Sequence, residues 1–367
     1  MTSFIFSYCS FCLFVYMFLE ASTLRGMLLS LSSLFIVLIL LFGQFSKRAD
    51  FFTYLVIMFS FIYLAPLLFN GSFHLIGAAS LSYVSTLASV LIASFFIAKR
   101  TCFYWLSYAI LTLFTVIIFL SYINSFITGI PFAFYADSIL LGQSRNVVSF
   151  YFIALSVGFV LSCNLNNKKP NMYLLSLVFF LNLLLISRTG IALSIVILSL
   201  VLMYYNKLLL VLLVGGVIVS TPYIIFFLIN ETNFSQGLDT PRTIMTSEYL
   251  SQITISNLLF GFDVSSMPTI NNFNGNAHNA YLSLSIHYGY PMLFFIFLSI
   301  SLLIVTVCVK RNFFVFILLS VLIVRYCSDT VAFNGFFTDY IFYTIAAYCL
   351  FSVRLFKARN ITSDQIQ

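Results

Sequence analysis

The stretch MYLLSLVFFLNLLLISRTGIALSIVILSLVLMYY, residues 172–205, contains two apolar runs joined by the polar sequence Ser187-Arg188-Thr189-Gly190. Each run approaches the roughly 20 apolar residues that cross a hydrocarbon core of about 30 Å. Neither run alternates polar and apolar residues as a membrane barrel strand does, so both are predicted to be helices. The stretch therefore predicts two membrane spans with almost no loop between them.

The rest of the chain has the same character. Of its 367 residues, 62% are hydrophobic and 7% are charged, whereas about a quarter of the residues of a soluble domain are charged. Residues 1–367 are therefore predicted to form one all-α, polytopic integral membrane domain. Segmentation at charges and at Gly, Pro and Asn clusters predicts about twelve transmembrane helices, near residues 4–19, 27–45, 51–69, 76–98, 103–126, 147–163, 172–187, 189–205, 208–229, 290–309, 313–327 and 339–353.

The basic residues predict which side of the membrane each loop occupies. If the N-terminus is cytoplasmic, twelve of the seventeen Lys and Arg residues fall in inner loops, and every lysine is among them. Eight of the ten acidic residues then fall outside. This is the positive-inside distribution of multi-pass proteins, so both termini are predicted to be cytoplasmic. Because the cations lie in pairs between apolar runs, their net charge has a topological explanation and nucleic acid is not an expected partner.

Two predicted outer loops are long enough to carry a site. They cover residues 128–146 and residues 230–289. The second loop holds most of the outer polar residues, and its apolar stretch Ile253–Phe260 predicts short helices along the membrane surface. Binding and catalytic residues are often found on loops that a rigid scaffold supports. We therefore expect the functional site on the outer face.

Arginine is the only basic residue predicted on that face. A guanidinium offers a planar pair of donors that fits phosphate oxygens, so this bias indicates anion recognition. The alternative is that topology rules simply exclude lysine from outer loops. The five outer arginines are Arg25, Arg145, Arg188, Arg242 and Arg325.

Two of these arginines have further alternatives. A charge at membrane depth costs roughly 3 kcal/mol on insertion scales, so Arg188 is expected to face a polar cavity. Otherwise Arg188 would be an interfacial side chain that snorkels toward water. Arg325 lies four residues before Asp329, and a structural ion pair explains it equally well.

His278 is the candidate general base. His278 and His287 flank the segment where the polar outer loop re-enters the membrane. A neutral imidazole accepts a hydroxyl proton near neutral pH, as a base for glycosyl transfer must. The alternative is an ordinary polar loop residue.

Metal and cofactor chemistry are not expected. Asp239, Glu248 and Asp263 are separated by 9 and 15 residues, which is not a metal-ligand spacing. Gly215-Gly216 lies in an apolar span and lacks the Lys and Ser of a phosphate-binding loop. Arginines would then have to neutralise any anionic leaving group.

Two motifs resemble those of the O-antigen ligase and O-antigen polymerase superfamily. His278-Asn279, nine further residues and Gly289 match its His-Asn-x9-Gly element, and Ser187-Arg188-Thr189-Gly190 resembles its Ser-Arg-x-Gly element between adjacent spans. The predicted spans and the late outer loop are similar over nearly the whole chain. The ligase pattern has Gly, Thr or Tyr three residues after the glycine, where this chain has Met292. That difference favours a polymerase.

The resemblance implies a glycosyltransferase of the membrane-embedded C type (GT-C) in the bacterial inner membrane, with its active site facing the periplasm. Its donor and acceptor would be oligosaccharides linked to undecaprenyl diphosphate. A chain-length regulator and a flippase of the same pathway would be partners. On this analogy a polymerase transfers a growing glycan onto the non-reducing-end sugar of a new lipid-linked repeat unit.

The resemblance also implies roles for individual residues. His278 would take the proton of the acceptor hydroxyl, while Arg188 and Arg242 would hold the departing diphosphate. These three are the expected catalytic residues. The expected substrate-binding residues, which add positive charge, orient His278 or contact sugar, are Arg145, Asn279, Tyr281 and Arg325.

Other functions compete with polymerisation. A ligase would attach the finished glycan to lipid A core, and a flippase would translocate lipid-linked oligosaccharide without chemistry. A flippase needs charges inside a central cavity, whereas nearly every charge here lies at a span boundary. A polyprenyl-phosphate-sugar transferase would use an acid in the first outer loop, where Glu20 sits beside Arg25. A secondary transporter would show paired interrupted spans in its two halves, and the sequence has none.

Overall fold

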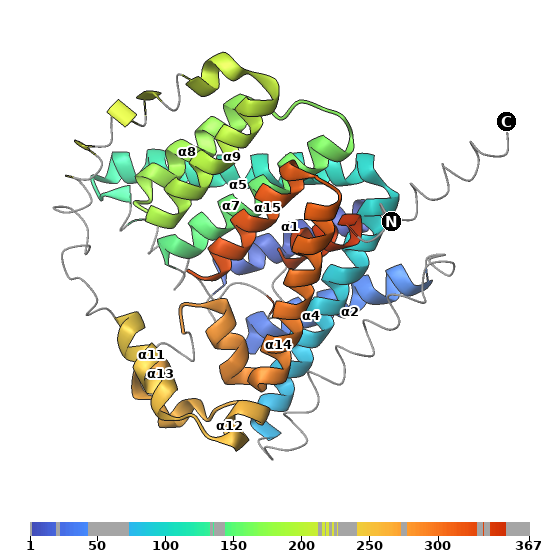
Figure 1. The fold of residues 1–367 in the computed structure, drawn as a ribbon, viewed down its shortest axis with the longest axis vertical. Helices are drawn as coiled ribbons and strands as arrows, with labels where there is room; N and C mark the ends of the chain where they lie inside the picture. The colour runs from blue at the N-terminus through green and yellow to red at the C-terminus, as the bar shows by residue number, and fades with distance from the viewer. Residues whose placement is uncertain are drawn as a thin grey trace.

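Helices make up most of the described part of the chain (Figure 1). In the computed structural model the described residues are 2–19, 23–42, 73–132, 135, 144–211, 241–272, 277–328, 333 and 338–349, with isolated residues between 215 and 226. Within these ranges every regular element is a helix. The predicted all-α fold class is therefore confirmed.

Four described helices are long and apolar enough to cross a membrane, which supports the prediction of a membrane protein. They are α5 (Arg100–Thr128), α7 (Arg145–Leu165), α9 (Arg188–Tyr205) and α14 (Ala280–Val309). The other apolar helices are α1 (Thr2–Phe18), α2 (Thr23–Phe42), α4 (Phe73–Ala98), α8 (Met172–Leu184), α15 (Phe313–Tyr326) and a helix over residues 339–349. The predicted span 51–69 and most of the predicted span 208–229 lie outside the described residues. The number of twelve spans therefore stays a prediction.

Helix α7 is the centre of the bundle. All its side chains from Val148 to Cys163 are buried, as expected for a helix that is apolar on every face. Helices α5, α8, α9 and α15 pack against it, and Figure 1 shows α7, α9 and α15 side by side. Small residues such as Gly158 allow close approach, which is the usual basis of helix association in membranes. Phe114 of α5 meets Phe152 of α7 with ring centroids 4.7 Å apart.

The N-terminal helices form a second packed group. Helices α2 and α4 lie along each other, and α1 contacts both α2 and α5. A buried chain of hydroxyls joins the three helices: Tyr8 Oη lies 2.9 Å from Ser33 Oγ, which lies 3.1 Å from Ser85 Oγ. Buried polar groups need such partners, so this chain fixes the relative positions of α1, α2 and α4.

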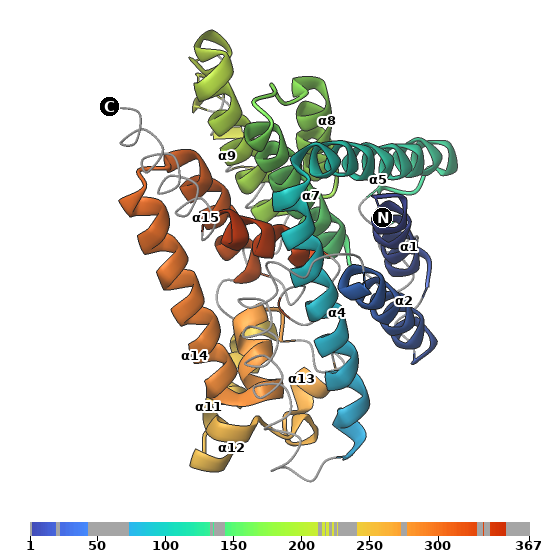
Figure 2. The same cartoon turned by 90° about the vertical axis from the view of Figure 1, so that its right-hand side faces the viewer.

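Helix α14 is two helices joined at Gly289. Gly289 has φ 74° and ψ −178°, a conformation that is essentially restricted to glycine. The Tyr281 ring stacks on the Phe297 ring at a centroid distance of 5.3 Å, whereas a straight helix would separate the two residues by about 24 Å. The chain therefore reverses at Gly289. Figure 2 shows the short first segment (residues 280–288) turned against the long second segment (residues 290–309).

The second segment of α14 has the bounds of the predicted span 290–309. The first segment, residues 280–288, is a further helix at the end of the predicted outer loop 230–289. Pro291 contributes to the break, since it has no N–H to donate to the carbonyl of His287. The structure thus places a short helix, which the sequence did not predict, directly before the chain reversal at Gly289.

The large predicted outer loop has its own small core. It contains α11 (Pro241–Ser251), α12 (Ile255–Phe260), the 3-10 helix η2 (Val264–Ser266) and α13 (Pro268–Asn272). Helix α12 confirms the short helix predicted within Ile253–Phe260. The core joins these elements to the first segment of α14 and consists of Met245, Tyr249, Phe262, Met267, Ile270, Ala277 and Ile286. Residues 230–240 and 273–276 of the loop lie outside the described residues.

Candidate functional site

The turn that carries Arg188 is tight and strained. Helix α8 ends at Leu184, Ile186 adopts φ 53°, and Ser187 caps α9 by accepting the Gly190 N–H at 3.4 Å. A positive φ is unusual for a β-branched residue, and such strain is often found at functional sites. Arg188 is the first residue of α9 and its side chain is exposed. The turn therefore presents the arginine at the start of a helix.

Gly190 is the point where this turn meets helix α7. A Cβ on Gly190 would lie 1.9 Å from Ser149 Oγ of α7 and 2.6 Å from Asn182 Oδ1 of α8. Both of these side chains are fully buried. The Asn182 Nδ2 donates to Ser194 Oγ of α9 at 3.0 Å. The glycine of the Ser-Arg-Thr-Gly sequence thus leaves space for the Ser149 and Asn182 side chains, and in their present positions no Cβ fits there.

This contact brings Arg145 and Arg188 to the same end of the bundle. Arg145 is the first residue of α7, one helical turn before Ser149, and Arg188 lies two residues before Gly190. At the far ends of the same helices, Tyr205 of α9 donates to the Lys168 carbonyl just beyond α7. The two helices are therefore parallel. Their N-terminal ends add partial positive charge to that of the guanidinium groups, an arrangement that attracts anions.

Arg325 is buried at the end of the bundle that carries Arg145 and Arg188. Its side chain is 1% exposed, and it donates to the carbonyl oxygen of Asn146 and to Ser328 Oγ at 3.0 Å. The guanidinium also lies 5.8 Å from the centre of the Phe150 ring. These contacts describe an arginine that supports the start of α7. Asp329, the predicted ion-pair partner, lies outside the described residues.

His278 and Asn279 begin the first segment of α14. Asn279 is the helix cap, and its Oδ1 accepts the N–H groups of Tyr281 at 3.0 Å and Leu282 at 3.2 Å. His278 precedes the cap, is half-buried and has φ 50°. Tyr281 is nearly buried, and its hydroxyl donates to the Ile323 carbonyl at 3.4 Å. In this structure Asn279 and Tyr281 orient the backbone that carries His278.

A series of contacts links the histidine motif to the arginines. Tyr281 contacts Ile323, which lies two residues before Arg325 on α15. Arg325 contacts Asn146, which follows Arg145. Ser149, one turn further along α7, meets Gly190 beside Arg188. The structure therefore brings Arg145, Arg188, Arg325 and the His278 motif to one end of the bundle.

Arg242 lies on a separate element. It is the second residue of α11, and α11 reaches the first segment of α14 through the hydrogen bond between Ser285 Oγ and Tyr249 Oη at 2.6 Å. Burial is the main cause that raises the pKa of Tyr249, to about 12, so the phenol is neutral at physiological pH. The structure connects Arg242 to the helix that follows His278, through the small core described above.

Glu248, in the predicted outer loop, is held by several hydrogen bonds. Burial acts to raise the pKa of its carboxyl, but hydrogen bonds from the Thr269 hydroxyl and the N–H groups of Thr269 and Ile270 outweigh it and lower the pKa. The Thr269 N–H lies 3.0 and 3.1 Å from the two carboxylate oxygens. The carboxylate thus fixes α13 against α11. Among the described residues no three His, Cys, Asp or Glu side chains gather as a metal site would require.

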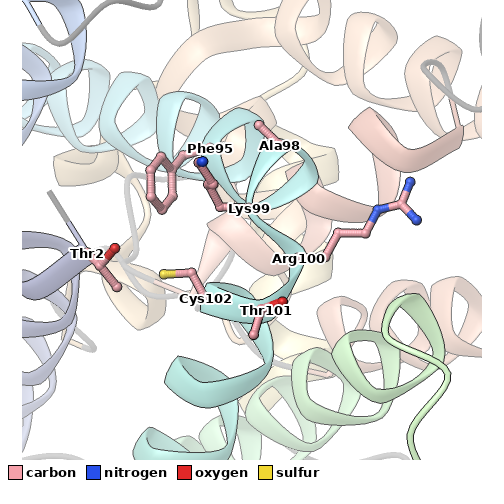
Figure 3. Close-up of a pocket in the computed structure, with 7 residues that line it drawn as sticks. All are labelled: Thr2, Phe95, Ala98, Lys99, Arg100, Thr101 and Cys102. Carbon is pink, nitrogen blue, oxygen red and sulfur yellow. The ribbon is translucent and has the colours of Figure 1, made fainter.

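A pocket of about 620 Å³ lies at the opposite end of the bundle (Figure 3). It lies at the junction of α4 and α5, and its lining residues are Thr2, Phe95, Ala98, Lys99, Arg100, Thr101 and Cys102. Figure 3 shows Thr2 of α1 facing Cys102, while the guanidinium of Arg100 points away from them. None of the predicted site residues lines this pocket. It is therefore distinct from the arginine end.

Further cations predicted to be cytoplasmic share this opposite end. The ammonium of Lys168 lies 3.9 Å from the centre of the Tyr104 ring. Asn166 Nδ2 donates to the Arg100 carbonyl at 2.9 Å. The lysine-bearing end and the arginine end are thus separated by the length of α7 and α9.

Two residues of the arginine end were not predicted from the sequence. Ser149 and Asn182 are polar residues within apolar runs, and only their packing against Gly190 connects them with Arg188. The one signal in the sequence is Asn182 itself, because an amide inside a membrane span usually has a functional or structural partner. Comparisons with protein-family models, curated proteins and solved structures give no match for this chain.

Proposed function

We propose that this protein is an O-antigen polymerase, a GT-C-type membrane glycosyltransferase that joins oligosaccharide repeat units linked to undecaprenyl diphosphate at the periplasmic face of a bacterial inner membrane. The observation that carries the proposal is that the N-termini of the parallel helices α7 and α9, which bear Arg145 and Arg188, lie at the same end of the bundle as the His278 motif. Guanidinium groups at helix N-termini suit a diphosphate, and a nearby imidazole suits a reacting hydroxyl.

In the proposed reaction the acceptor hydroxyl attacks the anomeric carbon of the donor glycan. A new glycosidic C–O bond forms, and the bond from the anomeric carbon to the diphosphate oxygen breaks. His278 takes the hydroxyl proton, and undecaprenyl diphosphate leaves with the electron pair. The donor is already activated by its diphosphate, so the step needs no external energy source.

The arginines would act mainly on the leaving group. Charge develops on the diphosphate as its bond to the sugar breaks, and preorganised cations stabilise charge that appears in a transition state. Arg188 is exposed and Arg145 is half-buried, which suits contact with a lipid-linked substrate. Arg242 is proposed to approach the same diphosphate from α11. Arg325 is proposed to act beneath them by holding the start of α7.

Deletion of the gene tests the function. Gel analysis of lipopolysaccharide from the deletion strain should show core carrying a single repeat unit. A ligase deletion would instead leave bare core while long lipid-linked glycan accumulates, and a flippase deletion would leave repeat units facing the cytoplasm. A full-length ladder in the deletion strain would refute all three assignments.

The site is tested in the same strain. Plasmid-borne Arg188→Ala and His278→Ala variants, matched to wild-type protein level, should fail to restore the ladder. A normal ladder from either variant would remove the role assigned to that residue.

A further inference from the structure

We propose that Ser149 and Asn182 are positioning residues that fix Arg188 relative to Arg145 by packing on Gly190. This inference rests on the proposed function, since it assigns to the two arginines a common diphosphate. Neither positioning residue would touch substrate. Each would act through the contact between helices α7, α8 and α9.

The contact is polar and fully enclosed. Ser149, Asn182 and Ser187 are at most 1% exposed, and Ser194 is 4% exposed. Such groups are costly inside an apolar bundle, so a cluster of them at one point has to be explained. Asn182 Nδ2 is satisfied by the Val178 carbonyl at 3.2 Å and by Ser194 Oγ. The amide therefore links α8 to α9 at Ser194, within two turns of Arg188.

Two atoms of the cluster have no hydrogen-bond partner among the described residues. They are Ser149 Oγ and Asn182 Oδ1. Both lie near the point where a Gly190 Cβ would be, at 1.9 and 2.6 Å, so they are no more than about 4.5 Å apart. One is a donor and the other an acceptor. The hydroxyl of Ser149 lies against Gly190 of α9.

The contact of Ser149 and Asn182 with Gly190 lies close to both arginines along the helices. Ser149 is one turn from Arg145, a rise of about 6 Å, and Gly190 is two residues from Arg188, a rise of about 3 Å. A methyl group at position 190 would lie 1.9 Å from Ser149 Oγ, so either the Ser149 and Asn182 side chains leave their present rotamers or α9 moves from α7. Arg188 would move with its helix, and displacements of this size are enough to impair a catalytic arrangement.

A double-mutant cycle separates positioning from general damage. Full-length protein in lipid nanodiscs is titrated with undecaprenyl diphosphate, using wild type, Gly190→Ala, Arg188→Ala and the double variant. We expect each single change to weaken binding about tenfold and the double variant to bind no worse than Arg188→Ala alone. Independent effects, with the double variant about a hundredfold weaker than wild type, would overturn the inference.

Matched controls are available on α7. Gly158→Ala places its Cβ 3.2 Å from the flexible Ile341 side chain, and Ser156→Ala removes an equally buried hydroxyl that also lacks a partner. Both should bind undecaprenyl diphosphate like wild type. The variant Ser149→Ala with Gly190→Ala should recover most of the affinity that Gly190→Ala loses, because the closest clash is gone.

The remaining outcomes are also decisive. If Gly190→Ala does not accumulate, Ser149→Ala replaces it in the cycle, with an expected loss of two- to fivefold that disappears in the Arg188→Ala background. An unchanged affinity for Ser149→Ala would then refute the inference. If wild type does not bind undecaprenyl diphosphate, the proposed function fails. If wild type binds and Arg188→Ala weakens binding while the Gly190 and Ser149 variants do not, only the positioning role fails.

Discussion

The guanidinium of Arg325 donates a hydrogen bond to the carbonyl oxygen of Asn146, so that the last turn of α15 supports the first turn of α7. Arg325→Lys keeps the charge but removes the planar fork that also reaches Ser328. We expect a loss of about 1.5–3 kcal/mol in stability, the usual value for a hydrogen bond made by a charged group. Thermal unfolding in detergent measures it. Arg311→Lys, at an exposed position, is the control and should leave the unfolding temperature unchanged.

Gly289→Ala tests the reversal of α14. The new Cβ would lie 2.6 Å from the Leu259 carbonyl oxygen, in a backbone conformation that alanine avoids. We expect a destabilisation of at least about 2 kcal/mol, seen as faster proteolysis of the segment around α12. Gly129→Ala is the matched control, because Gly129 also has a positive φ but no atom lies within 4 Å of its Cβ. It should cost only about 1 kcal/mol, and equal losses would contradict this explanation.

Acidification should loosen the contact between Glu248 and α13. The pKa of this carboxyl is lower in the folded protein than its ordinary value of 4.5, so its stabilising effect is complete above pH 4.5. The effect is lost as the pH falls through the lowered pKa and the carboxylate is protonated. Hydrogen exchange of the Thr269 and Ile270 amides should therefore report reduced protection at low pH. Glu248→Gln should lower the protection at neutral pH and remove its pH dependence. An unchanged profile in that variant would show that the carboxylate does not hold α13.

His278 and His287 should differ in function. His278→Ala should reduce turnover by about 10² to 10⁴, the usual effect of removing a general base, whereas His287→Ala should retain activity. The measurement is polymerisation of lipid-linked repeat units by purified protein. Loss of the pH dependence of turnover in His278→Gln would support proton transfer by this residue. Equal activity of the two alanine variants would exclude His278 as the base.

The apolar runs predicted most of the described helices because their positions depend mainly on local composition. The span 290–309 is an example, since a glycine and a proline mark its beginning in the sequence. The helical conformation of residues 280–288 was missed for the opposite reason. It depends on an asparagine cap and on contacts with α12, which lies more than twenty residues earlier.

The candidate site, too, could be predicted only in part from the sequence. Arg188, Arg145 and His278 were predicted because charged or titratable residues are rare in this chain and their positions at span boundaries are visible. Burial of Arg325 and the meeting of Ser149 with Asn182 depend on which helices are neighbours. Hydropathy does not contain that information, because every apolar span is compatible with many neighbours.

Gly261 lies against the main chain of Ile286 and His287, and Gly289 lies against the main chain of Leu258 and Leu259, so that two backbone segments meet at these glycines. A contact between two backbone segments depends on the conformation of the main chain and hardly at all on the surrounding side chains. Sequences that form this backbone contact are therefore free to diverge widely between the two glycines. A pair of glycines 28 positions apart, the second following a His-Asn cap by ten residues, is a more durable marker for recognising distant relatives than the intervening residues.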